Sequence, residues 1–384
     1  MSVMNCCKET LQPAEALMAR AVELARLGRG ATAPNPCVGA LLVRDGAIVA
    51  QGWHEAFGGP HAEVECLRQA REKGVDASAC ELYVTLEPCN HQGKTPPCTE
   101  AILAAGIRSV VVGCADPNPE VAGGGAEHLR SKGVNVRLGV LEGPCRDLIE
   151  DFRLWKTTDR PFVILKMAAT LDGRIAARGG RPEPISCPES QIEAHRLRSV
   201  CRAVIVGGNT FYSDDPLLTC RLPGLAPDHV QPFAVVVTRR LPKAHNFKLL
   251  QDRPERVVFW TSEEEARSLA SGTLTERGCR VWGLGRVEEG LDLRQGLVRL
   301  RAELNCWNVL CEGGGRLAMS LATQDLVDEL TLFLAPKVLG DEQAKALFSG
   351  RKAQSLAEAR DFRLLDCARS GRDLMLTYRP KRTD

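Results

Sequence analysis

The sequence predicts an α/β protein with two domains. A chain of 384 residues exceeds the size at which a single hydrophobic core stops growing. Apolar strand patterns alternate with helical patterns over residues 13–114 and again over residues 162–336, as in layered α/β domains. The stretch between them, residues 152–161, is polar and ends in proline, which favours a connector. We therefore expect one domain over residues 1–152 and a second over residues 160–384.

In the first half, apolar residues at helical spacing (Leu17, Ala21, Leu24) predict a helix over residues 13–27. Two apolar runs on either side of Asp45 and Gly46 predict a β-hairpin over residues 37–53. The elements expected next are a helix over residues 61–74, a strand over 81–86, a helix over 98–105 and a strand over 109–114.

The second half also alternates strands with helices. Strands are expected over residues 162–173, 203–208, 233–238, 256–261, 307–312 and 329–336. Helices are expected over residues 188–199, 263–271 and 316–324. No internal repeat accompanies the alternation.

The composition is that of a soluble globular protein. Lysine plus arginine (50) nearly balances aspartate plus glutamate (48), so charge gives no reason to expect a nucleic acid or an anionic membrane as partner. No run of about 18 apolar residues occurs, and the N-terminal segment lacks a basic leader with an apolar stretch. We expect a cytoplasmic protein whose 16 cysteines are mostly reduced thiols, buried or acting as ligands.

Four residues of the first half form a candidate metal site. His61, Cys89 and Cys98 are donors of the type that hold a catalytic zinc ion through three ligands and leave one position open. Glu63 lies two residues after His61, so it points in another direction and can move a proton. This set suits hydrolytic deamination, since zinc lowers the pKa of a water molecule and a carboxylate shuttles its proton.

The spacing of the two cysteines allows two interpretations. Nucleobase deaminases carry H-x-E followed by P-C-x-x-C, whereas Cys89 and Cys98 are nine positions apart. Either "NHQGKTPP" is a loop inserted between two ligands, or His61 caps a helix and the cysteines are ordinary core thiols. A closed zinc site with a purely structural role is a further interpretation.

The second half contains two less specific patterns. Asp214 and Asp215 before a proline fit a simple turn. Glu312 follows an apolar strand and precedes three glycines and a helix, where backbone N–H groups could approach a phosphate. Gly313, Gly315 and Ala318 satisfy G-x-G-x-x-A, but without the surrounding βαβ unit they are weak support for a dinucleotide fold.

The segments "APNPCVGALLV", "GWHEAFGGPHAEVECL" and "YVTLEPCNHQGKTPPCTEAI" resemble the deaminase domain of the bifunctional deaminase–reductase family of riboflavin biosynthesis. The resemblance implies a cytidine-deaminase-like α/β/α fold, one zinc ion on His61, Cys89 and Cys98, and Glu63 as proton shuttle. It also implies binding of a pyrimidine ribosyl phosphate by Asn35, His54, Lys94, Asp116 and Asn118.

The segments "LKMAATLDGRIA", "NTFYSDDPLLTCRLP" and "LCEGGGRLAMSL" resemble the reductase domain of the same family, whose fold is similar to dihydrofolate reductase. The resemblance implies that NADPH reduces the ribosyl group to ribityl. The implied NADPH contacts are Ala168, Thr210, Asp214, Thr238, Gly314, Gly315 and Arg316. The implied substrate contacts are Arg198, Leu218, Arg221 and Glu312, with the arginines suited to the phosphate.

One segment departs from the family pattern. Pro182 and Pro184 stand where many members have a polar residue and a tryptophan, and proline offers neither a side-chain donor nor an N–H. The alternative function is therefore a deaminase with a weakened or non-catalytic reductase domain. Deaminases of tRNA or free nucleosides are less favoured, because they give no reason for a reductase-like second domain. A homo-oligomer is left open.

Overall fold

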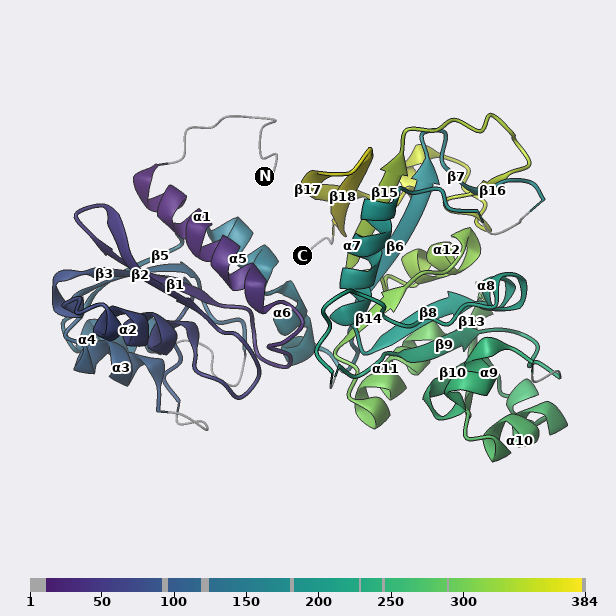
Figure 1. Cartoon of the computed structure of the whole chain (residues 1–384), viewed down its shortest axis with the longest axis horizontal. Coiled ribbons are helices and arrows are strands. Elements are labelled where there is room, and N and C mark those ends of the chain that lie inside the picture. The colour runs from purple at the N-terminus through teal and green to yellow at the C-terminus, as the bar shows by residue number, and fades with distance from the viewer. Residues whose placement is uncertain are drawn as a thin grey trace. The chain divides into compact units, whose positions relative to one another are not determined.

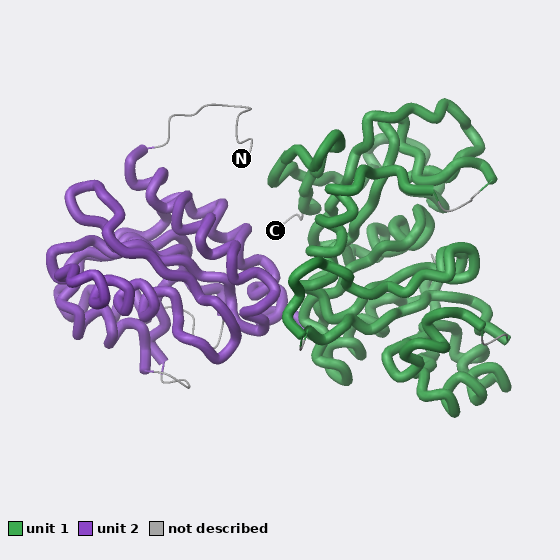
Figure 2. Tube along the Cα trace, viewed as in Figure 1, with its two compact units in different colours: residues 1–7, 159–384 green, residues 8–158 purple. Residues whose placement is uncertain are grey.

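The computed structural model describes residues 12–91, 96–118, 124–179, 183–227, 229–243, 246–288 and 290–381. These residues form two compact units that divide between Thr158 and Asp159 (Figure 2). Each unit has its own β-sheet and its own hydrophobic core. Among the described residues, no helix combines the length and apolar composition needed for a membrane span.

The first unit is a three-layer α/β/α structure. Its five-stranded sheet has the order β2-β1-β3-β4-β5, in which β3, β4 and β5 run parallel and β1 is antiparallel to both neighbours. Helices α1 and α5 cover one face, and α2, α3 and α4 cover the other (Figure 1). The strands are β1 (Gly39–Arg44), β2 (Ala47–Trp53), β3 (Glu81–Leu86), β4 (Ser109–Cys114) and β5 (Asn135–Leu138). The helices are α1 (Pro13–Ala25), α2 (Ala62–Glu72), α3 (Cys98–Ala104), α4 (Gly125–Ser131), α5 (Glu142–Leu148) and α6 (Glu150–Thr157).

Two local features explain how this sheet is built. Asp45 and Gly46 both have positive φ angles, 52° and 77°, as a two-residue hairpin turn between β1 and β2 requires. Gly52 lets α2 approach the sheet closely, because a Cβ at this position would lie 2.4 Å from the backbone nitrogen of Cys66. The hairpin and the close packing of α2 together fix the position of β2. His61, which comes just before α2, lies beside this part of the sheet.

The second unit is built on a nine-stranded sheet. The strand order is β11-β10-β9-β8-β14-β6-β15-β18-β17, and the strands from β11 to β15 all run parallel while β18 is antiparallel to its neighbours. The long strands are β6 (Phe162–Thr170), β8 (Ala203–Gly207), β9 (Phe233–Val237), β10 (Val257–Ser262), β11 (Arg280–Leu284), β14 (Asn308–Cys311), β15 (Glu329–Ala335), β17 (Phe362–Ser370) and β18 (Asp373–Pro380). Two short pairs, β7 (Arg174–Ala176) with β16 (Lys345–Ala346) and β12 (Arg286–Val287) with β13 (Gly290–Leu291), lie outside it. The helices are α7 (Pro188–Ser199), α8 (Gly208–Asp214), α9 (Lys248–Asp252), α10 (Leu269–Glu276), α11 (Leu293–Leu304) and α12 (Gly315–Thr323).

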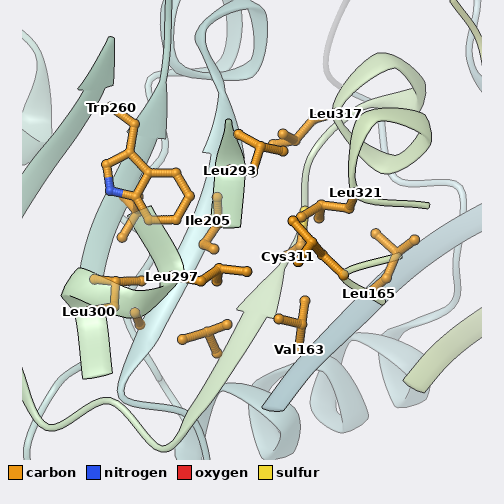
Figure 3. Packing of buried hydrophobic residues seen from close by; sticks show 14 of the residues in the cluster. Val163, Leu165, Ile205, Trp260, Leu293, Leu297, Leu300, Cys311, Leu317 and Leu321 are labelled. Carbon is orange, nitrogen blue, oxygen red and sulfur yellow. The ribbon is translucent and has the colours of Figure 1, made fainter. Parts of the chain in front are cut away.

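Side chains that alternate along β10 show why helices cover both faces of this sheet. Trp260 is fully buried in a cluster with Leu297 of α11 and Leu321 of α12 (Figure 3). Its neighbour Phe259 points the other way and packs edge-on against Phe211 of α8, with 5.8 Å between ring centroids. Both the mixed α/β sheets and the helix layers agree with the predicted fold class.

The predicted connector is mostly helical. Helix α6 occupies Glu150–Thr157, and Phe152, Leu154 and Trp155 are buried along it. The predicted segment thus contains the division between the units, but its first part is the end of an amphipathic helix whose polar residues are the less buried ones. The chain leaves the first unit only after Thr158.

Other expected elements also differ. The helix expected over residues 263–271 is a 3₁₀ turn at Glu265–Arg267 followed by α10, which begins at Leu269 because the Ser268 hydroxyl oxygen accepts the N–H of Ser271. The turn expected at Asp214 and Asp215 is the C-terminal end of helix α8, and this helix was not predicted. Helix α11 and the C-terminal hairpin of β17 and β18 were not predicted.

Replacing Gly296 with alanine should destabilise the second unit. A Cβ on Gly296 would lie 2.6 Å from the Trp260 ring, which is enclosed on all sides, so overpacking should cost about 1–3 kcal/mol despite the better helix propensity of alanine. Gly272→Ala is the matched control, because it is also helical and a Cβ there would meet nothing within 4 Å. Urea denaturation of the full chain measures both variants. The packing argument would be contradicted if Gly272→Ala unfolded at as low a urea concentration as Gly296→Ala.

Candidate active sites

Three side chains from three elements meet at one end of the first sheet. His61 is the residue immediately before α2, Cys89 follows β3, and Cys98 is the first residue of α3. The His61 Nδ1 atom lies 3.6 Å from Cys89 Sγ and 3.3 Å from Cys98 Sγ, and all three donor atoms lie within 4.8 Å of one another. Tetrahedral zinc with one nitrogen and two sulfur ligands places such atoms about 3.5 Å apart, so this donor set fits zinc.

Hydrogen bonds close the loop between the two cysteines. The backbone N–H of Cys98 donates to Cys89 Sγ at 3.3 Å, and the N–H of Thr99 donates to the Cys89 carbonyl at 3.3 Å. The Thr99 hydroxyl donates to Asn90 Oδ1 at 2.8 Å. These hydrogen bonds tie the start of α3 to the residues after β3. Two ligands that are nine positions apart in the sequence therefore lie next to each other. Lys94 lies in this loop but outside the described residues.

The pKa values of the two thiols are shifted in opposite directions. Hydrogen bonding from Cys98, together with that from His61, holds the pKa of Cys89 well below its usual range. The hydrogen bond to Cys89, together with burial, holds the pKa of Cys98 well above its own. The two sulfur atoms are thus hydrogen-bonded to each other and to His61, as expected for neighbouring ligands of one metal ion.

Glu63 lies in the first turn of α2 and is 3% exposed. Burial raises the pKa of its carboxyl group, and the nearby Cys89 raises it further. A carboxyl group of this kind can both accept and return a proton near neutral pH. It lies among the predicted ligands without belonging to the three-donor group.

Asn35 and His54 form a hydrogen-bonded pair beside His61. The Nδ1 atom of His54 donates to the carbonyl of Pro60 at 2.8 Å, so its Nε2 atom, 3.2 Å from Asn35 Nδ2, is the acceptor. Burial lowers the pKa of His54, which keeps the ring neutral. The Asn35 amide is thereby oriented with its nitrogen toward His54, and its oxygen can accept from a ligand.

Asp116 and Asn118 follow β4, the strand next to β3. The carboxylate of Asp116 accepts the N–H of Asn118 at 2.9 Å, and burial raises the pKa of Asp116. Since β3 and β4 are parallel, these residues emerge at the same edge as Cys89. The structure thus places the described residues predicted for the deaminase site at one edge of one sheet.

The predicted reductase residues lie along a sheet edge of the second unit. Ala168 is near the end of β6, Thr210 is in α8 just after β8, Thr238 follows β9, and Gly314 and Gly315 follow β14. Strands β9, β8, β14 and β6 are adjacent and parallel, so their carboxyl ends meet at one edge, where open α/β sheets bind ligands. Asp214 is farther away, exposed at the last residue of α8.

The start of α12 fits a phosphate-bearing cofactor. A Cβ at Gly314, the residue that caps this helix, would meet nothing within 4 Å. A Cβ at Gly315 would lie 2.4 Å from the carbonyl oxygen of Ala346, so no other residue type fits there. The first-turn N–H groups of a helix have no helical partner and can receive an anion at this open side. Arg316 is exposed on the same turn.

Glu312 is the centre of a partly buried charge cluster. Arg198 donates to both of its carboxylate oxygens, at 2.5 and 2.8 Å, and Lys166 Nζ lies 3.9 Å away. Burial alone would raise the pKa of Glu312, but Lys166 and Arg198 outweigh it and the pKa is lowered. Sequence reasoning missed Lys166, although a single lysine inside an apolar strand was a usable signal.

This cluster changes the expected role of Arg198. Its third hydrogen bond goes to the Thr219 carbonyl at 2.9 Å, so its guanidinium serves Glu312 and the loop after α8. Arg221 is exposed, and its guanidinium donates to Thr219 Oγ1 at 3.0 Å. Arg221 is therefore the better of the two arginines for a phosphate.

His195 holds the loop that carries Arg221. Its Nδ1 atom accepts the backbone N–H of Arg221 at 3.2 Å. Burial lowers the pKa of His195, and Arg198 and Arg221 lower it further, so the ring stays a neutral acceptor. Leu218, in the same loop, is buried with a φ of 51°.

The proline segment is held through its backbone. The carbonyl oxygen of Pro184 accepts a hydrogen bond from Lys337 Nζ at 3.2 Å, and its side chain is exposed. Pro182 lies outside the described residues. The exposed Pro184 side chain itself offers no hydrogen bond.

The two units together define a two-domain enzyme with a metal-dependent hydrolytic site and a separate cofactor site. Two family models match the chain: the cytidine and deoxycytidylate deaminase zinc-binding region over residues 11–114, and the RibD C-terminal domain over residues 161–376. The riboflavin biosynthesis protein RibD of Aquifex aeolicus is 41% identical over 324 residues, which cover 84% of this chain and 87% of that protein. The RibD of Synechocystis is 39% identical over 368 residues, 94% of each chain.

Solved structures give the same result. A diaminohydroxyphosphoribosylaminopyrimidine deaminase/5-amino-6-(5-phosphoribosylamino)uracil reductase from Thermotoga maritima is 36% identical with a TM-score of 0.77. RibD from Acinetobacter baumannii is 33% identical with a TM-score of 0.76. Each match covers 96% of this chain and 99% of the other.

The chain belongs to the RibD family of riboflavin biosynthesis proteins. It has a zinc-binding deaminase domain and an NADPH-dependent reductase domain, which confirms the predicted fold class, the bifunctional enzyme and both cofactors.

Removing one of the three donors should remove the metal. Cys98→Ala is expected to lower bound zinc from about one ion per chain to nearly none, because two remaining ligands hold zinc poorly. Cys66→Ala is the control, since this buried thiol lies on α2 outside the three-donor group. Atomic absorption on purified protein measures the content. Zinc that stays with the Cys98 variant and leaves the Cys66 variant would place the site elsewhere.

Proposed function

We propose that the first unit deaminates a diaminopyrimidinone ribosyl phosphate and that the second unit then reduces the ribosyl group to ribityl. The observation that supports the first step is the buried Glu63 beside three zinc donors, with Asn35 and Asp116 at the same edge. The order of the two steps follows the name of the Thermotoga maritima enzyme, whose reductase activity acts on a uracil and therefore on a deaminated ring.

In the deaminase site, we assign zinc to His61, Cys89 and Cys98. Zinc, when bound, makes water a nucleophile at neutral pH. Glu63 takes one proton from the water and delivers it to a ring nitrogen as the oxygen bonds to the ring carbon. It then moves the second proton, from the new hydroxyl, to the amine, so that the C–N bond breaks, ammonia leaves and a carbonyl remains. Its raised pKa suits both steps.

Substrate binding at this site is assigned to polar groups around the ligands. The oxygen of Asn35, held by His54, accepts an N–H of the pyrimidine. Asp116 and Asn118 bind the substrate from the end of β4. Lys94 is proposed to meet the phosphate, as a cation on the loop between the two cysteines.

In the reductase site, NADPH supplies a hydride. We assign its contacts to Ala168, Thr210, Asp214, Thr238 and the turn formed by Gly314, Gly315 and Arg316. The open start of α12 supports a phosphate at that turn.

We assign binding of the reductase substrate to the polar cluster around Glu312 and to the loop after α8. Glu312, kept ionised by Lys166 and Arg198, accepts a hydrogen bond from a sugar hydroxyl. Arg221 meets the phosphate, and Leu218 shapes the loop between them. Arg198 contributes by holding Glu312.

A deaminase with a weakened reductase is the second candidate. The observation behind it is the exposed Pro184 side chain, which offers no hydrogen bond where the family has a polar or aromatic one. The intact Glu312 cluster favours a working reductase instead.

We also propose that the enzyme works in the cytoplasm. Every described cysteine is a free thiol, which supports a reducing compartment such as the cytoplasm. The partner is a small-molecule substrate.

Glu63→Gln should abolish deamination and spare reduction. The amide keeps the shape of the side chain but cannot shuttle a proton, so ammonia release should fall by about 10²–10⁴-fold. Zinc content and NADPH oxidation with pre-deaminated substrate should stay at the wild-type level. The control is Glu65→Gln on the same helix, where the side chain pairs with Arg68 at the surface. Ammonia release that survives Glu63→Gln would refute the proton-shuttle assignment.

A further inference from the structure

The carboxylate of Glu87 joins two segments beside the deaminase site. Glu87 directly follows β3, two residues before Cys89, and is 7% exposed. Its Oε2 atom accepts the backbone N–H of Asp116 at 3.2 Å, and its Oε1 atom accepts the N–H of Ala126 at 2.9 Å. Asp116 follows β4 and Ala126 lies in the first turn of α4, so one side chain fixes two elements.

The surrounding backbone leaves this carboxylate little freedom. The N–H of Glu87 donates to the Cys114 carbonyl at 2.9 Å, which continues the pairing of β3 with β4. A Cβ at Gly125 would lie 2.0 Å from the carbonyl oxygen of Pro88 and 3.3 Å from Glu87 Cγ. The first turn of α4 is therefore packed directly on Glu87 and Pro88.

A series of hydrogen bonds leads from Glu87 to the substrate side. Glu87 holds the backbone of Asp116, and the Asp116 carboxylate in turn accepts the N–H of Asn118. Hydrogen bonds from N–H groups to a buried carboxylate are stronger than neutral ones, and losing an acceptor leaves a buried donor unpaired. The position of Asp116 and Asn118 thus depends on a residue that is itself no ligand of the metal.

We propose that Glu87 is a positioning residue for deamination, which sets Asp116 and Asn118 at the distance where they bind the pyrimidine substrate. The proposal rests on the proposed function, in which these two residues contact the substrate. Glu87 acts through them, and not on the reacting atoms.

The test is the kinetics of Glu87→Gln in the full-length enzyme. In Glu87→Gln, the side-chain NH₂ group would face a backbone N–H that donates to a carboxylate oxygen in the wild-type enzyme. Two donors would then face each other. We expect KM for the diaminopyrimidine substrate to rise about tenfold or more, while kcat changes less than about threefold. Zinc content and NADPH oxidation by the second unit should stay at the wild-type level.

Glu81→Gln is the matched control. Glu81 begins the same strand, and its carboxylate accepts a hydrogen bond from Ser109 at 2.6 Å at the end away from the metal ligands. Its KM should stay within about twofold of the wild-type value, because this partly buried side chain lies at the opposite end of β3 from the site. An equal rise in KM for both variants would overturn the proposal, since it would show a general effect on the strand.

Two further variants keep the proposal falsifiable. Glu87→Asp keeps the charge but is one methylene shorter, so it should raise KM to an intermediate level even if Glu87→Gln does not fold. Asp116→Ala tests the proposed function separately. A raised KM for Asp116→Ala with an unchanged KM for Glu87→Gln and Glu87→Asp would overturn the role of Glu87 alone. Unchanged KM values in all three would overturn the substrate role of Asp116 as well. Loss of zinc with Glu87→Gln would also overturn the proposal, because Glu87 would then support Cys89.

Discussion

In the central part of each sheet, neighbouring strands run parallel, so the residues at their carboxyl ends lie together at one end of the strands. Glu87 after β3 and Asp116 after β4 become hydrogen-bonded neighbours in this way, although 29 positions of sequence separate them. Glu312 after β14 likewise comes within 3.9 Å of Lys166 in β6. Each site depends on this pairing, because its side chains come from several different strands and helices.

Three carboxyl groups with little exposure lie at these ends of the strands, and their surroundings differ. Burial raises the pKa of Glu63, so this carboxyl group can carry a proton. Glu312 lies between Lys166 and Arg198, which lower its pKa and keep it an acceptor. Glu87 receives two backbone N–H groups and holds structure in place. We therefore propose three roles for the same type of side chain: proton shuttle in Glu63, ligand acceptor in Glu312 and tether in Glu87.

The deaminase site could be predicted from the sequence because His61, Glu63 and the two cysteines are reactive residue types in a recognisable order. The contact of Arg198 with Glu312 could not be predicted, because 114 positions separate the two residues. Glu87 was missed because its partners are backbone N–H groups, which leave no trace in a sequence. The β1–β2 hairpin and most parallel strands were expected, because apolar runs and turn residues mark them. Helix α6 and the hairpin of β17 and β18 were missed, since buried residues stand among polar ones in the first and most residues are only partly buried in the second.

Whether the two sites act in sequence on one substrate is measured most directly by the mass of the products. The full chain is incubated with the diaminopyrimidine ribosyl phosphate, with and without NADPH. We expect the deaminated ribosyl product alone without NADPH, and the deaminated and reduced ribityl product with it. A deaminated product that stays unreduced when NADPH is present would contradict a working reductase, and a reduced product that keeps its amino group would contradict the order of the two steps.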